Sequence, residues 1–269
     1  MEETQELERV FLFQKKKPLF LNLEKVWGID LTIKHNGSGF LNPIIVAIDK
    51  NSETEAYELS KELRGYIGAI KLGLEYFDTY GPEGIIKIQN LDIPIFLDLK
   101  IHDIPQTVKK TIKTLSSLKP AILNVHALGG KKMMKYALEA ISQSSPETNL
   151  IAVTILTSLD NDDLSMMGID ISVKNLVSNL AKLAKETGLS GVVCSSEEIQ
   201  MVRESCGKNF KIIVPGIRPK GSDKDDQKRV MTPKEAIILG ADHLVIGRPI
   251  TDSKDPKNTV IEIVNSIKW

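Results

Sequence analysis

The segment FLDLKIHDIPQT, residues 96–107, contains two aspartates and a lysine within a span of six positions. Asp98 and Lys100 are two residues apart, so the alternation of an extended strand directs both side chains to one face. Asp103 follows where the chain turns, and Pro105 suits the first turn of a helix. Charged groups are costly to desolvate unless they pair. The segment therefore indicates either a site of chemistry or a structural ion pair.

Two further charges end the preceding apolar runs of the chain, and they favour the first interpretation. Asp49 follows VAI, and Lys71 lies in IKLG, so the four charges Asp49, Lys71, Asp98 and Lys100 alternate in sign. Opposite charges close together keep lysines protonated and aspartates ionised. Such a network suits proton delivery by a lysine beside a fixed anion. The pattern shows no nucleophile–histidine–aspartate relay.

Two glycine-containing segments near the C-terminus indicate an anion site. VPGIRP (214–219) contains Gly216, which exposes backbone N–H groups, and Arg218; IGRPI (246–250) contains Gly247 and Arg248. Barrel enzymes often bind phosphate between their last two strand-end loops, using backbone donors and a helix N-terminus. An arginine adds a planar, permanently charged donor fork. A surface arginine in a turn is the alternative for Arg248.

Other polar candidates have equally ordinary structural explanations. Thr157 and Ser158 have hydroxyls that suit hydrogen bonds to a ligand or a helix cap. The polar stretch 219–233 lacks a core-forming period and by itself fits a surface loop. His102 and His126 have no partner at metal-ligand spacing, so we interpret both as structural hydrogen-bonding groups and expect no metal.

The secondary-structure elements that would position these residues repeat in a regular order from residue 43 onward. Apolar, β-branched runs alternate with amphipathic stretches, as in parallel strands covered on both faces. Eight strands are expected at 44–49, 67–72, 95–100, 121–126, 150–155, 191–194, 211–215 and 243–246. They predict an α/β chain folded as a (β/α)₈ TIM barrel over 43–269, with a doubly wound sheet as the alternative. Residues 1–42 do not follow this order and are assigned to an N-terminal accessory extension.

Composition excludes several classes of protein. Lys plus Arg and Asp plus Glu number 35 each, so no net charge draws the 269-residue chain to nucleic acid or to an anionic membrane. The two cysteines form no disulfide framework, and no apolar run reaches the roughly 20 residues of a membrane span. We expect a soluble protein of a reducing compartment, the cytoplasm.

The segment DLKIHDIPQT closely resembles the signature of the orotidine 5′-phosphate decarboxylase family in its bacterial form. Other segments match in the family's order, over about residues 43–267: VAID, KLGLEYF, NVHALGG, VTILTS, VPGIRP, DQKRVMTP and IGRPI. One departure is Gln106, where related bacterial sequences often have asparagine. The resemblance implies decarboxylation of orotidine 5′-monophosphate to UMP without metal or organic cofactor.

The resemblance also implies roles for the candidate residues. Asp98 would lie against the substrate carboxylate, and Lys100 would stabilise and protonate the carbanion at C6. Lys71 and Asp49 would lie near the ribose within the charge network, and Thr157 would contact the base. Asp103 and Thr107 would complete the partner's site in a homodimer. The phosphate would be bound by Gly216, Arg218, Gly247 and Arg248, and Gln227, in a loop that closes over the ligand, would bridge phosphate and pyrimidine. Arg229 is a weaker candidate in the same loop.

Two rival functions remain open on the residues alone. A metal-dependent sugar-phosphate decarboxylase or hexulose-phosphate synthase shares an Asp-x-Lys-x-x-Asp core, but it needs another carboxylate for Mg²⁺. Glu75 is the local candidate, and it lies where the next helix should begin. A non-catalytic nucleotide-binding barrel would keep Gly216 and Arg248 but could dispense with Lys100.

Overall fold

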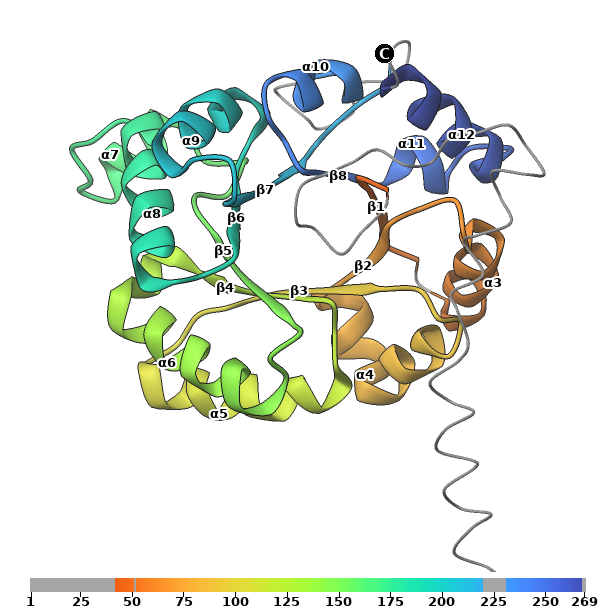
Figure 1. Cartoon of the computed structure of the whole chain (residues 1–269), viewed down its shortest axis with the longest axis horizontal. Helices are drawn as coiled ribbons and strands as arrows, with labels where there is room; N and C mark the ends of the chain where they lie inside the picture. Colours follow the sequence, from red (N-terminus) through yellow and green to blue (C-terminus); the bar gives the residue numbers. More distant parts are fainter. Residues whose placement is uncertain (1–41, 51, 220–230, 268–269) are drawn as a thin grey trace, which may run out of the picture. The chain divides into compact units, whose positions relative to one another are not determined.

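A computed structural model describes residues 42–50, 52–219 and 231–267. Eight strands form a closed barrel in sequence order, and every neighbouring pair, including β1 with β8, is parallel. Figure 1 shows the helices outside this ring of strands. The strands are β1 Ile44–Ile48, β2 Ala69–Gly73, β3 Ile95–Ile101, β4 Ile122–His126, β5 Asn149–Val153, β6 Gly191–Val193, β7 Lys211–Pro215 and β8 His243–Ile246.

Helices connect successive strands, as parallel neighbours require, and the last two helices follow the final strand. They are α3 Glu53–Leu63, α4 Leu74–Gln89, α5 Pro105–Leu115, α6 Gly130–Ser144, α7 Asn161–Met166, α8 Val173–Thr187, α9 Ile199–Cys206, α10 Pro233–Ile238, α11 Arg248–Thr251 and α12 Pro256–Ile267. Short 3₁₀ turns occur at η2 Ser116–Leu118, η3 Ala127–Gly129 and η4 Ser196–Glu198.

The predicted (β/α)₈ barrel is confirmed, and the doubly wound alternative is excluded by the pairing of β1 with β8. Pro105 begins α5, as expected of a residue whose missing N–H has no partner in a first helical turn. Strand ends differ from the expected ones by up to two residues; for example, β5 ends at Val153 rather than at 155. The prediction for residues 1–42 falls outside the described residues apart from Asn42. That residue hydrogen bonds to the carbonyl of Tyr66.

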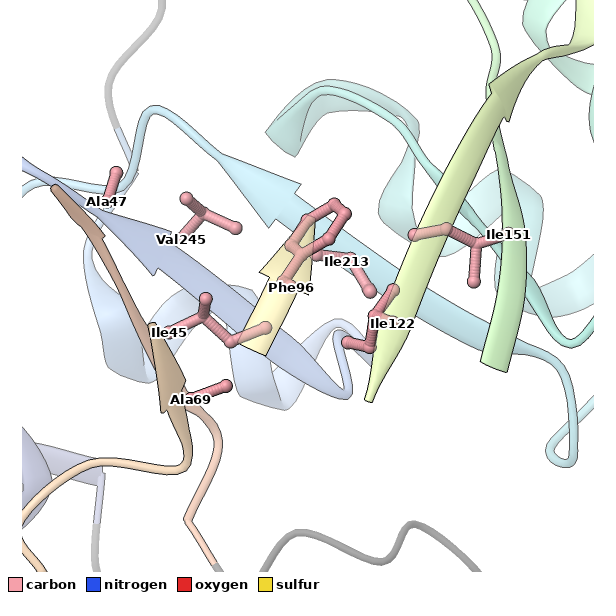
Figure 2. Close-up of a cluster of buried hydrophobic side chains, with 8 residues drawn as sticks. All are labelled: Ile45, Ala47, Ala69, Phe96, Ile122, Ile151, Ile213 and Val245. Atoms are coloured by element: carbon pink, nitrogen blue, oxygen red, sulfur yellow. The ribbon is translucent and has the colours of Figure 1, made fainter. Parts of the chain in front are cut away.

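An apolar cluster fills the barrel and sets the level of the polar groups above it. Seven strands contribute to it, and Figure 2 shows its members: Ile45, Ala47, Ala69, Phe96, Ile122, Ile151, Ile213 and Val245. Successive side chains of a strand alternate in direction, so the residues two positions further along face the same interior. The positions two residues after Ala69, Phe96 and Ile122 are polar. The barrel interior thus changes from apolar to charged and polar toward the C-terminal ends of the strands.

Within the residues that the structure describes, no helix has the length and apolar character required to cross a membrane.

Candidate active site

Four charged side chains form a continuous chain of ion pairs at the C-terminal ends of β1, β2 and β3. Lys100 Nζ lies 2.8 Å from Asp98 Oδ1, and Lys71 Nζ lies 3.4 Å from Asp98 Oδ2. Lys71 Nζ is also 3.9 Å from Asp49 Oδ1. The side chains of Asp98 and Lys71 are 10% and 14% exposed, whereas that of Lys100 is 34% exposed and that of Asp49 is 63% exposed. The network therefore runs from a buried carboxylate to groups that a ligand can reach.

The Asp98 carboxylate stays ionised in spite of its burial. Burial alone would raise the pKa of Asp98, but Lys71, Lys100 and the hydrogen bonds from Lys100 and Asn124 lower it below its ordinary value. Both oxygens of the carboxylate thus face cations. Asp98 is a fixed negative charge at neutral pH, and its ammonium partner Lys100 lies closer to solvent.

Simple strand alternation does not explain how Lys100 reaches Asp98. Lys100 has a φ of 48°, in the left-handed region that residues with a Cβ rarely adopt. The register between β3 and β4 shifts between Leu97 and Ile101, as at a β-bulge. Bulges re-aim side chains beside active sites. Asp98 and Lys100 do face each other, but through a local break in the strand.

Asn124 of β4 belongs to the same cluster and was not among the candidates from the sequence. Its Nδ2 donates to Asp98 Oδ1 over 2.6 Å, and its Oδ1 accepts from the backbone N of Lys100 over 2.8 Å. The residue is fully buried. One signal could have revealed it: a lone amide inside the apolar run ILNVH is costly to bury unless both its ends are hydrogen bonded.

Asp103 and Thr107 are not part of the ion pairs that link Asp49, Lys71, Asp98 and Lys100. Asp103 is exposed in the loop between β3 and α5, and Thr107 is exposed in the first turn of α5. Asp103 Oδ1 accepts from the backbone N of Ile104, and no ion pair to Asp103 occurs in the described part of the chain. Ile104 is 68% exposed although it is apolar.

The candidate anion loops follow β7 and β8, which are hydrogen-bonded neighbours. Gly216 has a φ of 76°, a backbone conformation that favours glycine. Arg218 is buried, and its backbone N donates to the carbonyl of Met231. Gly247 precedes the short helix α11, and Arg248 is its exposed first residue. Because β8 pairs with β1, the C-terminal end of β8 lies beside that of β1, which Asp49 follows.

The remaining candidates are either exposed or outside the described residues. Thr157 and Ser158 are exposed in a turn after β5. Gln227 and Arg229 lie outside the described residues. Glu75 is exposed in the first turn of α4, the helix that was expected to begin there. No group of three or more histidine, cysteine or acidic residues that could hold a metal ion occurs among the residues described.

The two histidines form a stacked pair beside the network. The rings of His102 and His126 are 5.4 Å apart and 19° from parallel. His126 Nδ1 accepts from the backbone N of Leu128, so this nitrogen carries no proton. Burial, then His102 and Lys100, lower the pKa of His126 to about 4. A neutral imidazole that caps the η3 turn agrees with a structural hydrogen-bonding role.

The fold and the site define a (β/α)₈ barrel with an alternating chain of lysines and aspartates at the C-terminal ends of its first three strands. Barrel enzymes place their chemistry at this end. Residues 42–263 match the model of the "Orotidine 5'-phosphate decarboxylase / HUMPS family". The chain belongs to this family.

Individual relatives cover the same part of the chain. Orotidine 5'-phosphate decarboxylase from Wolbachia sp. subsp. Brugia malayi (strain TRS) is 50% identical over 227 residues, 84% of this chain and 100% of the relative. The enzyme of that name from Ehrlichia canis (strain Jake) is 51% identical over 226 residues, 84% of this chain and 98% of its own. The crystal structure of orotidine 5'-phosphate decarboxylase from Lactobacillus acidophilus matches with a TM-score of 0.76 at 36% identity, covering 85% of this chain and all of that one.

The depressed pKa of His126 predicts a pH-dependent stability. An unfolded histidine titrates near 6.5, so between about pH 4 and pH 6.5 the unfolded chain binds a proton that the folded protein excludes. The free energy of unfolding should therefore fall as the pH decreases through this window, by up to about 1.4 kcal/mol per pH unit. Urea unfolding at several pH values should show a shallower slope for His126→Gln than for the wild type.

His102→Gln is the matched control, since it removes the stacked ring and leaves the burial of His126, the largest cause of the shift, in place. It should keep most of the wild-type slope. Equal slopes in the wild type and in His126→Gln would contradict the neutral state assigned to His126.

Proposed function

We propose that this protein decarboxylates orotidine 5′-monophosphate to UMP and CO₂ in pyrimidine biosynthesis, without a metal ion. The observation that carries the proposal is the Lys71–Asp98–Lys100 cluster, with a buried carboxylate held ionised between two lysines. The printed names of the relatives at 50% and 51% identity support the substrate. The reaction would take place in the cytoplasm, where the buried cysteines Cys194 and Cys206 would remain reduced.

The chemical step uses the charges of the cluster in a defined order. The bond between C6 and the carboxylate breaks, its electron pair stays on C6, and CO₂ departs. Asp98, adjacent to the substrate carboxylate, disfavours the charged ground state that this step removes. The Lys100 ammonium stabilises the developing negative charge at C6 and then transfers a proton to it. The resulting neutral amine regains its proton from water.

The remaining residues bind the parts of the substrate that do not react. Asp49 and Lys71, at the ends of β1 and β2, are proposed for the ribose hydroxyls, and Thr157 for the pyrimidine. The phosphate is assigned to Gly216, Arg218, Gly247 and Arg248, at the ends of the adjacent strands β7 and β8. Gln227 is proposed to bridge phosphate and base. Binding energy from the phosphate can lower the barrier at the base only if the site closes around both.

A homodimer completes the proposed site. Asp103 and Thr107 are exposed, and among the described residues they are not part of the ion pairs of their own network, so we place them in a partner's site. Three exposed apolar residues form an apolar rim after the adjacent strands β2, β3 and β4: Leu74, Ile104 and Leu128 are 51%, 68% and 44% exposed. Burial of this rim against its copy would favour a two-fold interface with two composite sites.

The rival metal-dependent sugar-phosphate reaction needs a further carboxylate to bind Mg²⁺ beside the lysine cluster. Its extra carboxylate would have to be Glu75, which is exposed on the first turn of α4 and, among the described residues, forms no ion pair with the lysine cluster. The non-catalytic barrel has no use for an ionised Asp98 clamped between lysines. Both rivals therefore explain less of the geometry.

Replacement of Lys100 by alanine tests the proton donor. Turnover, followed by the ultraviolet absorbance of orotidine 5′-monophosphate, should fall by about ten-thousand-fold or more, because one group supplies both the cation and the proton. Calorimetric binding of UMP should remain measurable, since the phosphate contacts are untouched. The control is Lys87→Ala, which removes an exposed lysine of α4 that pairs with Glu53 of α3, and it should retain turnover. Turnover of Lys100→Ala near the wild-type level would refute the assignment.

Mixing two inactive variants tests the shared site. A heterodimer of Lys100→Ala and Asp103→Ala chains has one site carrying both changes and one site carrying neither. Random exchange of subunits should therefore restore about a quarter of wild-type activity. Activity that stays at the level of the separate variants, in a mixture shown by mass spectrometry to contain heterodimers, would place Asp103 outside the partner's site.

A further inference from the structure

The side-chain amide of Asn124 hydrogen bonds both to the Asp98 carboxylate and to the backbone of Lys100. It lies on β4 between the buried residues Leu123 and Val125 and is itself fully buried. Its Nδ2 donates to Asp98 Oδ1 over 2.6 Å, and its Oδ1 accepts from Lys100 N over 2.8 Å. Lys100 Nζ donates to the same oxygen of Asp98 over 2.8 Å. These three bonds close a ring that contains the carboxylate, the lysine and the amide.

The chemistry of the two partners fixes the orientation of this amide. A backbone N–H can only donate, and an ionised carboxylate can only accept. A side chain at position 124 must therefore accept on one side and donate on the other. An aspartate cannot donate, and an aliphatic residue can do neither, so asparagine suits this position where its isosteres do not.

The bond to Lys100 N also explains a backbone that is otherwise unfavourable. Lys100 adopts a φ of 48°, which a residue with a Cβ avoids unless its surroundings hold it there. The ladder between β3 and β4 is interrupted between Leu97 and Ile101, so the Lys100 N–H lacks a regular strand partner there. The Asn124 side chain takes the place of that partner.

We propose that Asn124 is a positioning residue, which holds the Lys100 backbone in its left-handed conformation and one Asp98 oxygen in place, and so sets the separation of carboxylate and ammonium. The inference rests on the function proposed above. Asn124 does not touch the substrate in this account; it acts through Asp98 and Lys100. Without it, Lys100 can return to a regular strand conformation, and its ammonium then leaves the position required for proton transfer.

The first experiment compares Asn124→Ala with the wild type. We expect kcat to fall about a hundred-fold, as for a misplacement of about 1 Å in a reacting group, while KM changes less than about three-fold. Asn149→Ala is the matched control: Asn149 begins β5, where its amide contacts Ala121 and Lys211 at the opposite end of the barrel. It should leave kcat unchanged. An unchanged kcat per folded Asn124→Ala molecule would overturn the proposal.

The variant Asn124→Asp provides a readout that a merely structural residue would not affect. The new carboxylate can still accept from Lys100 N, but it lies against Asp98, and two adjacent carboxylates do not both ionise readily. The acidic limb of the kcat/KM profile should therefore move to higher pH. A profile that coincides with that of the wild type would contradict the proposed contact.

Hydrogen exchange of the Lys100 backbone amide separates this inference from the proposed function. In Asn124→Ala this amide loses its acceptor, so it should exchange at least ten-fold faster than in the wild type. Unchanged exchange would overturn the positioning role even if turnover fell. A wild-type protein without turnover would instead refute the proposed function, while the exchange result would still decide whether Asn124 holds Lys100.

Discussion

The Asp98 carboxylate is the group on which the arrangement of the site depends. Its side chain is 10% exposed, and such a charge is tolerated only because Lys71, Lys100 and Asn124 surround it. Removal of any partner would leave a buried charge less compensated. The carboxylate therefore draws together the ends of β2, β3 and β4, and it keeps an ammonium group at 2.8 Å on the side that opens to solvent.

The barrel makes this interaction possible by dividing its interior into two levels. Apolar side chains such as Ala69, Phe96 and Ile122 fill the lower level. Two residues further along the same strands, Lys71, Asp98 and Asn124 face the same interior. The apolar level excludes water from beneath the charges, which strengthens their interactions with one another and with any ligand above them. The same packing thus stabilises the fold and sets the electrostatics of the site.

Much of this could be predicted from the sequence, because apolar, β-branched runs and strand-end charges are local signals. The eight strands, the barrel and the proximity of Asp49, Lys71, Asp98 and Lys100 follow from them. The left-handed backbone of Lys100 could not be predicted, since nothing in the residue type favours it and its cause is a hydrogen bond to a residue 24 positions away. Asn124 was missed although its place inside an apolar run was a signal, because its two partners lie 24 and 26 positions away on a neighbouring strand. The roles of Asp103 and Thr107 depend on a second chain and stay predictions.

The most direct test of the account is an assay of purified, chelator-treated protein with orotidine 5′-monophosphate. If the lysine–aspartate cluster alone performs the chemistry, the absorbance of the substrate should decline, with one UMP and one CO₂ formed per molecule consumed, at the same rate as before chelation. Absence of turnover until a divalent metal ion is restored, or turnover of a sugar phosphate instead, would contradict it.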